Sequence, residues 1–415
     1  MVKSVAVFEY VVGGGFSNTQ LETSLVVEGY AMLRSLLQDL KRSGYWVATT
    51  LDERLASTFK LQADKQVTVS REEDPMEKLE ALLGLVEGVI VIAPAFKDAL
   101  YKVTRFLEKR GSLVLGSNSN AVLTSSDKRL TLIALQKLQL HTPKTKIATM
   151  EEDVDQVRLK VEEIGYPVVF KPADGVGCIG ASIVKNYSQI GSALSLVRKH
   201  TKTKHFLIQE FLDGTHISVS LLSNGEKAVP LTLNMQKVKV RPPPLGLSFE
   251  GNIVPFRHRL AEKAKNAARV AVESIEGLRG YVGVDLVLTR EHPYIIEINP
   301  RLTTSYLGLR KILNLELGDV LVQTSLGLYV PKKIKCKGVA VVTKTSFPFS
   351  SKLFQKDFSS LDKNIEIVVS PLLPEFSVQR KGFMLFTAYG KSLKEVKTLI
   401  KNFKQNIHGM FTGSG

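Results

Sequence analysis

Residues Gly283–Arg301 read G-V-D-L-V-L-T-R-E-H-P-Y-I-I-E-I-N-P-R, and the rest of the chain can be interpreted outward from them. Two short apolar runs flank a polar turn, a pattern that predicts a β-hairpin. Glu297 and Asn299 are two residues apart, so a strand places both side chains on one face. The hairpin can bring Asp285, on the first strand, beside them.

Two carboxylates and an amide oxygen on one sheet face form an oxygen-only site, which suits Mg²⁺ that already carries phosphate, with Mn²⁺ as an alternative ion. Arg301 follows at once and supplies a fixed cation for phosphate oxygens. Taken alone, Asp285 could equally be a solvated strand residue or half of a salt bridge. The set of Asp285, Glu297, Asn299 and Arg301 favours a site, because acids inside apolar strands need a charge partner.

The composition is that of a soluble globular protein with two or three domains. The chain has 415 residues, 44% of them hydrophobic and 23% charged, and no apolar run approaches the ~20 residues of a membrane span. Residues 1–9 contain a lysine and an acid and predict a first strand rather than a signal peptide. Cys178 and Cys336 are too few for a disulfide framework or a zinc site, so we expect a reducing, cytoplasmic location.

The net charge of +16 is compatible with an anionic substrate, nucleic acid or a lysine-rich surface. Basic residues are spread along the chain, with higher density at 198–204 and 237–241. No zinc-finger, RNP-type or KH-type motif is present, so we do not expect a nucleic-acid partner.

Strands alternate with helices over the first 115 residues, which predicts a parallel α/β sheet. A glycine loop, Gly13–Gly15, follows the first strand at the edge where open α/β sheets bind ligands. Its N–H groups could hold a carboxylate or phosphate. A plain flexible turn is an equally open interpretation.

A second glycine loop contains Gly175-x-Gly177-x-x-Gly180. A dinucleotide-binding loop should open into a helix and have an acid about 20 residues on, but here residues 181–184 continue as a strand and the later region is basic. A strand–loop–strand flap fits better, with backbone amides that can close over phosphates and Lys171 at its base. The following sequence predicts strands at 206–212, 215–222 and 227–233, a basic loop over 234–244, a helix over 259–275, and further strands and a last helix beyond 331.

This set of motifs resembles the ATP-grasp superfamily. Its members share, in this order, a helix lysine (Lys128), Lys171-Pro before a glycine loop, the stretch Gln209–His216, and the acids of the hairpin. The resemblance implies an α/β fold with α+β grasp domains. We expect a parallel-sheet pre-ATP-grasp domain over 1–120, an ATP-grasp domain over 121–330 with a flap subdomain at about 145–215, and a small α+β domain over 331–415.

A narrower resemblance points to the archaeal tyramine–glutamate ligase group, which acts in methanofuran biosynthesis. It rests on Phe8–Phe16, Val27–Leu33, Leu51–Arg54 and Asn299–Tyr306. The relatives are shorter, so the stretch after about residue 331 departs from them. Residues 380–395 resemble the small C-terminal domain that closes some other ATP-grasp ligases.

The resemblance also implies a role for each matching residue. Lys128 and Lys171 would hold ATP phosphates under the flap glycines Gly175 and Gly177, with Lys171 and Arg301 as catalytic residues and Arg301 facing the transferred phosphate. The remaining roles would be adenine contacts by Gln209, Glu210, Phe211 and Leu212, ribose contacts by Asp213 or His216, and coordination of two Mg²⁺ by Asp285, Glu297 and Asn299. Lys128 as a surface residue and His216 as a locally satisfied strand residue remain open.

The implied reaction activates a carboxylate as an acyl phosphate and couples it to an amine, giving an amide, ADP and phosphate. For glutamate and tyramine, Arg54 could contact a carboxylate, and Tyr10, Phe16 and Tyr306 could line an aromatic pocket or simply pack in the core. One alternative is an ATP-grasp carboxylase or carbamoyl-phosphate-type synthetase that uses bicarbonate. Another is a non-catalytic nucleotide-binding protein. The expected partners are the small-molecule carboxylate and amine, without membrane contact, and a homodimer is open.

Overall fold

The N-terminal part of the computed structural model is a four-stranded parallel sheet in the order β3-β2-β1-β4. The structure describes the chain except residues 1, 176–177, 202, 349–361, 370–380 and 413–415. The sheet contains β1 (Ser4–Glu9), β2 (Trp46–Asp52), β3 (Lys65–Val69) and β4 (Gly88–Ile92). Its helices are α1 (Thr23–Arg42), α2 (Glu53–Ala56), α3 (Pro75–Leu83), η1 (Phe96–Asp98) and α4 (Ala99–Lys109). The predicted parallel sheet is therefore confirmed.

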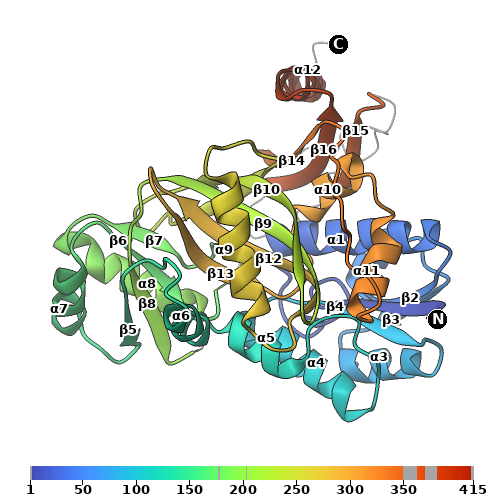
Figure 1. Cartoon of the computed structure of the whole chain (residues 1–415), viewed down its shortest axis with the longest axis horizontal. Helices are drawn as coiled ribbons and strands as arrows, with labels where there is room; N and C mark the ends of the chain where they lie inside the picture. The colour runs from blue at the N-terminus through green and yellow to red at the C-terminus, as the bar shows by residue number, and fades with distance from the viewer. Residues whose placement is uncertain (1, 176–177, 202, 349–361, 370–380, 413–415) are drawn as a thin grey trace.

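A second, antiparallel sheet forms the separate green lobe of Figure 1. Its strand order is β5-β8-β6-β7, with β5 (Thr145–Thr149), β6 (Val168–Pro172), β7 (Ser182–Val184) and β8 (His205–Glu210). Helices α7 (Val154–Ile164) and α8 (Ile190–His200), with the short η2 (Tyr187–Gln189), complete it. Strands β6 and β7 pair antiparallel, which confirms a strand–loop–strand arrangement around the second glycine loop.

The central sheet has eight strands in the order β13-β12-β9-β10-β11-β14-β16-β15. Its first five members in sequence are β9 (Thr215–Asn224), β10 (Ala228–Lys239), β11 (Ser248–Val254), β12 (Arg279–Leu288) and β13 (Pro293–Asn299). The predicted hairpin is β12–β13, in which Asp285 pairs with Glu297 and Gly283 with Asn299. The expected basic loop over 234–244 is wrong in its first half, because β10 continues to Lys239 and pairs with β11. No Gly or Pro lies between Leu233 and Pro242 to end the strand.

Helices fix the three sheets relative to one another. Helix α9 (Ala261–Glu273) packs on β10 of the central sheet, and α5 (Ser119–Ser126) and α6 (Lys128–Lys137) contact β13. Helices α10 (Tyr306–Ile312) and α11 (Leu317–Ser325) lie against α1, so they join the hairpin to the N-terminal sheet. No helix in the described ranges has the length and apolar character that crossing a bilayer requires.

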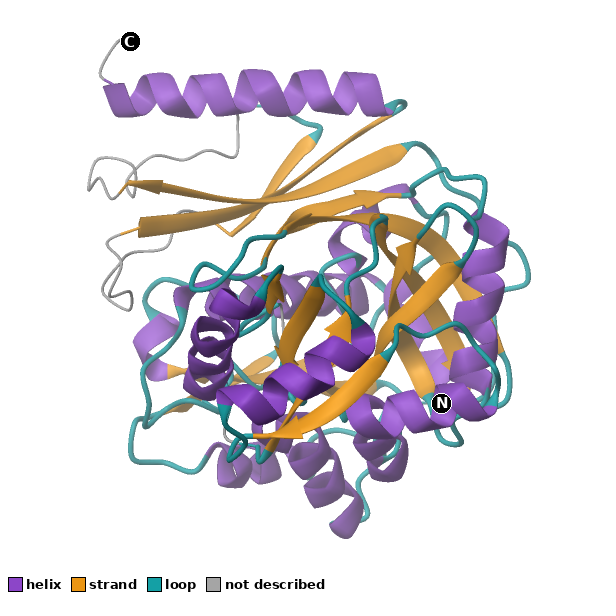
Figure 2. Cartoon of the chain, turned by 90° about the vertical axis from the view of Figure 1, so that its left-hand side faces the viewer, coloured by secondary structure: helices purple, strands orange, loops and turns teal. Residues whose placement is uncertain are grey.

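The last strands continue the central sheet. They are β14 (Val339–Pro348), β15 (Ile365–Val369) and β16 (Lys381–Gly390), and β14 pairs with β11. Helix α12 (Leu393–Thr412) covers this end of the sheet, as Figure 2 shows at the top of the view. The predicted strands and final helix are confirmed. The domain boundaries at 120 and 330 stay predictions.

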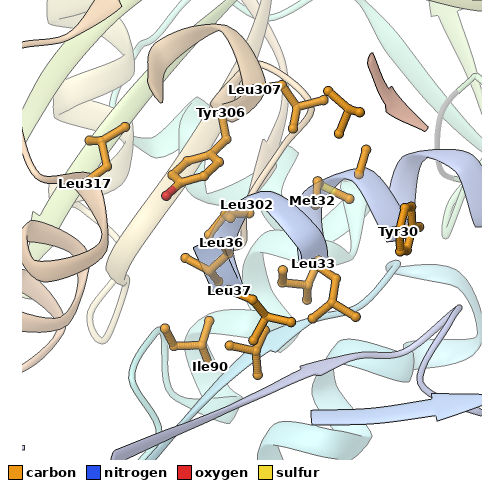
Figure 3. Packing of buried hydrophobic residues seen from close by; sticks show 14 of the residues in the cluster. Tyr30, Met32, Leu33, Leu36, Leu37, Ile90, Leu302, Tyr306, Leu307 and Leu317 are labelled. Atoms are coloured by element: carbon orange, nitrogen blue, oxygen red, sulfur yellow. The ribbon is translucent and has the colours of Figure 1, made fainter. Parts of the chain in front are cut away.

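The largest apolar core lies where α1, α10 and α11 meet the N-terminal sheet (Figure 3). Two buried polar contacts cross it. The Tyr306 hydroxyl donates to Asp39 at 2.7 Å, and Arg310, whose side chain is 3% exposed, donates to Asp39 at 2.7 Å. Arg310 also pairs with Glu366 on β15 at 3.0 Å. Helix α10, which follows the acidic hairpin, is thus held to both α1 and the C-terminal strands.

Candidate active site

The hairpin acids lie side by side and are linked through amides. The Asn299 Nδ2 group donates to Asp285 at 3.2 Å and to Glu297 at 3.3 Å. Gln236 Nε2, from β10, donates to the other Asp285 oxygen at 2.9 Å. Burial and the neighbouring Glu297 charge raise the pKa of Asp285 well above its usual range. The sequence-predicted acids therefore meet on one sheet face, and Gln236 joins them.

Two lysines from different elements neutralise these acids. Lys128 is the first residue of α6, whose N-cap Asp127 accepts the Arg129 N–H. The Lys128 Nζ lies 2.9 Å from Glu297 Oε2, and the Lys128 side chain is 9% exposed. Burial acts to raise the pKa of Glu297, but Lys128 and Lys171 lower it to about 2. The sequence left open whether Lys128 is a surface residue, and the structure shows that its side chain is buried.

Lys171 lies at the base of the glycine loop on β6 and is buried. Burial, together with repulsion from Lys128, lowers its pKa to about 8, although Glu297 opposes this shift. Lys171 is buried, and the nearby acids do not fully balance its charge. An anion that binds beside Lys171 would therefore stabilise its charged form.

A cavity of about 940 Å³ opens between the central sheet and the second sheet, with Lys128, Lys171, Asp285 and Glu297 at its polar end. Most of its wall is apolar, which suits a flat heterocycle. The wall includes Val169, Pro172, Ile179, Ala181, Phe211, Leu212, Val238, Val240, Leu247, Leu286, Val287 and Ile296.

The segment from β8 to β9 crosses this cavity where the chain passes from one sheet to the other. Gln209, Glu210, Phe211, Leu212 and His216 all line the cavity, as expected for nucleotide-binding residues. The Glu210 N–H donates to Lys144 and the Phe211 N–H to Pro167, so both amides serve the fold. Burial lowers the pKa of His216, which keeps its imidazole neutral near pH 7. Asp213 is exposed and is not among the lining residues.

The described part of the glycine loop closes the polar end of the cavity. The Gly175 carbonyl accepts a hydrogen bond from Lys128 Nζ at 2.8 Å. Gly180 has a φ of +74°, and a Cβ there would lie 2.9 Å from both His200 and Pro172. Cys178 is a free thiol that lines the cavity. Gly177 lies outside the described residues.

Arg301 and Asn299 border a narrow space that meets the large cavity. Lys128, Gly175 and Glu297 line both cavities. The predicted residues are thus divided between a nucleotide-sized space and an adjoining pocket that Arg301 and Asn299 border. A reacting group in the small pocket would be next to the end of a nucleotide in the large one.

The residues present fit a hard divalent cation. Among the described residues, no cluster of three or more His, Cys, Asp and Glu side chains is placed to hold a metal ion. Asp285, Glu297 and Asn299 instead offer carboxylate and amide oxygens, the donors that Mg²⁺ prefers in protein sites that also bind phosphate. Burial first and the Glu297 charge second raise the pKa of Asp285, and a bound divalent cation would relieve the repulsion between the two acids.

Other residues that the sequence indicated as ligand-binding instead make contacts within the fold. The Gly13 and Gly15 amides donate to Glu9 and Tyr10 within their own turn, so the idea that they bind a carboxylate is not supported. Arg54 pairs with Asp52 at 2.6 Å and donates to the Phe16 and Thr19 carbonyls.

Tyr306 is 1% exposed and packs in the core near Leu36 (Figure 3), which makes it a core residue and not a pocket residue. Gln236 was missed because its strand was taken for a loop. The uninterrupted run up to Pro242 was the signal that could have found it.

Comparison with known proteins agrees with this geometry. A family model described as the ATP-grasp domain matches residues 125–305, and one described as the pre ATP-grasp 3 domain matches residues 45–122. A protein named tyramine–L-glutamate ligase from Methanocaldococcus jannaschii is 30% identical over 337 residues, which are 81% of this chain and 93% of the relative. The protein of the same name from Methanocaldococcus fervens is 32% identical over 73% of this chain and 88% of its own length.

A solved biotin carboxylase from Campylobacter jejuni superimposes with a TM-score of 0.75 at 15% identity, covering 97% of this chain and 90% of that one. This likeness concerns the fold, and its coverage includes the C-terminal strands. The curated relatives carry the family assignment, because the chain spans nearly their whole length at 30% identity or more. The chain therefore belongs to the ATP-grasp family, in its tyramine–glutamate ligase group, and is an ATP-dependent carboxylate–amine ligase.

Proposed function

We propose that this protein joins the carboxylate of L-glutamate to the amine of tyramine, with ATP converted to ADP and phosphate. The supporting observation is the meeting of Lys128, Lys171 and the acidic hairpin at the end of a nucleotide-sized cavity. The substrates are those in the names of the two relatives, tyramine and L-glutamate. A role in methanofuran biosynthesis and a cytoplasmic location belong to the same proposal.

The chemistry follows from the charges. A carboxylate is a poor acyl donor because its oxygen does not leave, whereas the phosphate of an acyl phosphate leaves readily. Lys171 and Lys128 would hold the ATP phosphates, and Arg301 would face the group in transfer from the adjoining pocket. Asp285, Glu297 and Asn299 would hold Mg²⁺, which supplies charge neutralisation at the phosphates when bound. The carboxylate takes the terminal phosphate of ATP, which gives the acyl phosphate and ADP. The amine then attacks the acyl carbon and loses a proton, and phosphate departs.

The adenine would lie among the apolar residues between the two sheets, beside Phe211 and Leu212, with His216 near the ribose. Neutral His216 can accept or donate a hydrogen bond without attracting a phosphate. The loop around Gly175 would cover the phosphates and exclude water, which would otherwise hydrolyse the acyl phosphate.

The test is incubation of the protein with ATP, Mg²⁺, glutamate and a panel of amines, with ADP measured by a coupled assay and products by mass spectrometry. The expected product is the adduct of glutamate and tyramine less one water. ADP release with bicarbonate alone, and no amide with any amine, would favour the carboxylase alternative. An amide built on another amino acid would keep the ligase and change only the donor.

A further inference from the structure

A third cleft, of about 960 Å³, opens on the other side of the glycine loop from the nucleotide cavity. It lies at the carboxyl end of β1 and β4, the edge at which open α/β sheets bind ligands. Its walls come from the loop after β1, the start of α1, the segment after β4, the glycine loop and the end of α8. The lining residues are Phe16, Thr19, Gln20, Glu22, Leu25, Pro94, Phe96, Gly175, Ile179, Lys199, His200 and Thr201.

This cleft shares Gly175 and Ile179 with the nucleotide cavity. Gly175 lines the third cleft, the nucleotide cavity and the small Arg301 pocket. The carbonyl of Gly175 binds Lys128 Nζ at 2.8 Å, and that nitrogen is 2.9 Å from Glu297. A molecule in the cleft would therefore present its inner end beside the place where the acyl phosphate is expected to form.

The apolar part of the cleft is aromatic and held in place. The Phe16 ring contacts Tyr10 edge to face at 5.4 Å, and Arg54 donates to the Phe16 carbonyl at 2.7 Å. Phe96 contributes a second ring from the segment after β4, and Leu25 and Ile179 complete the apolar wall. The Phe16 ring, which is fixed in this way, offers a preorganised surface for a flat apolar group.

The polar part of the cleft contains one acid, Glu22, and one lysine, Lys199. Glu22 is the N-cap residue of α1 but makes no side-chain hydrogen bond to the helix, and its side chain is exposed to the cleft. Burial raises the pKa of Glu22, Lys344 opposes this shift and Glu28 adds to it, and the charge of Glu28 also acts on Arg301. Burial and Lys199 lower the pKa of His200, so its imidazole is neutral near pH 7 and does not repel an ammonium group.

We propose that this cleft is the binding site for the acceptor amine, and that it selects a primary amine with an aromatic ring. The ring would pack against Phe16 and Phe96, and the ammonium group would approach Glu22. This inference rests on the proposed ligase reaction and states where its second substrate, the amine, binds. It gives a role to the hydrogen bond from Arg54 to the Phe16 carbonyl, because Arg54 does not line the nucleotide cavity.

The test distinguishes an effect on amine binding from an effect on the binding of ATP or glutamate. Steady-state KM values are measured for ATP, glutamate, tyramine and n-hexylamine with the wild type, Phe16→Leu, Glu22→Gln and the control Glu80→Gln. Glu22→Gln should raise the KM of both amines at least tenfold, and Phe16→Leu should raise that of tyramine only. The KM values of ATP and glutamate should change less than twofold. Glu80→Gln removes an exposed acid that does not line the cleft, and it should leave all four KM values unchanged.

Three results would overturn the assignment. The cleft would instead hold the acid if Glu22→Gln raised the KM of glutamate and not of the amines. It would hold neither substrate if both variants, folded by circular dichroism, kept all KM values. The aromatic selection would be wrong if the wild type used n-hexylamine as well as tyramine.

If the wild type makes no amide at all, the proposed function fails, and saturation-transfer NMR with tyramine then decides the cleft separately. Tyramine binding to the wild type that is lost in Glu22→Gln supports the amine site in this cleft. No binding to the wild type, or equal binding to the wild type and Glu22→Gln, contradicts it.

Discussion

Glu9 should make the stability of this protein fall as the pH rises through neutrality. It ends β1 and is 1% exposed, and its Oε2 accepts the Val12 N–H at 2.7 Å. On its other side is Gly29 of α1, where a Cβ would lie 2.7 Å from the Glu9 carboxylate. Burial raises the pKa of Glu9 from 4.5 to about 8, although Val12 and Arg301 oppose the shift.

A carboxyl whose pKa is raised by folding stabilises the fold while it is protonated. That contribution is complete below pH 4.5, decreases as the pH rises, and is lost above pH 8. At about 1.36 kcal/mol per pKa unit, the loss is about 3 kcal/mol at pH 7 and about 5 kcal/mol above pH 8. Glu9→Gln cannot ionise and keeps an oxygen for the Val12 N–H, so it should escape this loss.

The assay is urea unfolding of the wild type and Glu9→Gln from pH 4.5 to 9, followed by circular dichroism. The two proteins should have similar midpoints at pH 4.5, and the variant should be increasingly more stable at higher pH. Glu80→Gln is the control, because Glu80 forms an exposed pair with Arg110 and should show no such gain. A stability difference between wild type and Glu9→Gln that stays constant over this range would refute the argument.

Three further perturbations test other parts of the molecule. Glu297→Gln removes a charge that contacts Lys128 at 2.9 Å and should reduce ADP formation at least ~100-fold with the fold retained; near-normal turnover would mean that the acids do not serve the phosphates. Gly180→Val forces a side chain into a φ of +74° against His200 and Pro172, so kcat should fall at least tenfold, while circular dichroism should show a native fold. Glu366→Ala breaks the pair with buried Arg310 at 3.0 Å and should lower the free energy of unfolding by about 1–3 kcal/mol in urea, an effect that a matched Glu291→Ala change at an exposed position should lack.

The sequence predicted the site better where the information was local. Period-two alternation around Asp285 and Glu297 is enough to place both acids on one face, and the observed register pairs them directly. The strand–loop–strand form of the second glycine loop was likewise readable from residues 181–184. Local pattern also predicted the parallel sheet, because strands and helices alternate in order.

What could not be predicted depends on contacts between distant segments. Gln236 joins Asp285 only because β10 and β12 flank β9 in the central sheet, and sequence order gives no such neighbour relation. The amides of Gly13 and Gly15 looked available for a ligand, but their use within a turn is decided by the backbone path. Tyr306 looked like a pocket residue because an aromatic residue beside a motif carries no sign of whether it faces a cavity or the core.

The C-terminal strands have a physical connection to the substrate side of the molecule. Lys344 on β14 contacts both Ser24 and Glu28 of α1, the latter at 2.6 Å. These residues are within two turns of Glu22, which lines the proposed amine cleft. Burial raises the pKa of Glu22, and the charge of Lys344 opposes that shift. Strand β14 therefore continues the central sheet and also contacts the end of α1 at which the second substrate is proposed to bind. Among the described residues, the nucleotide cavity is lined by residues 128–297 alone.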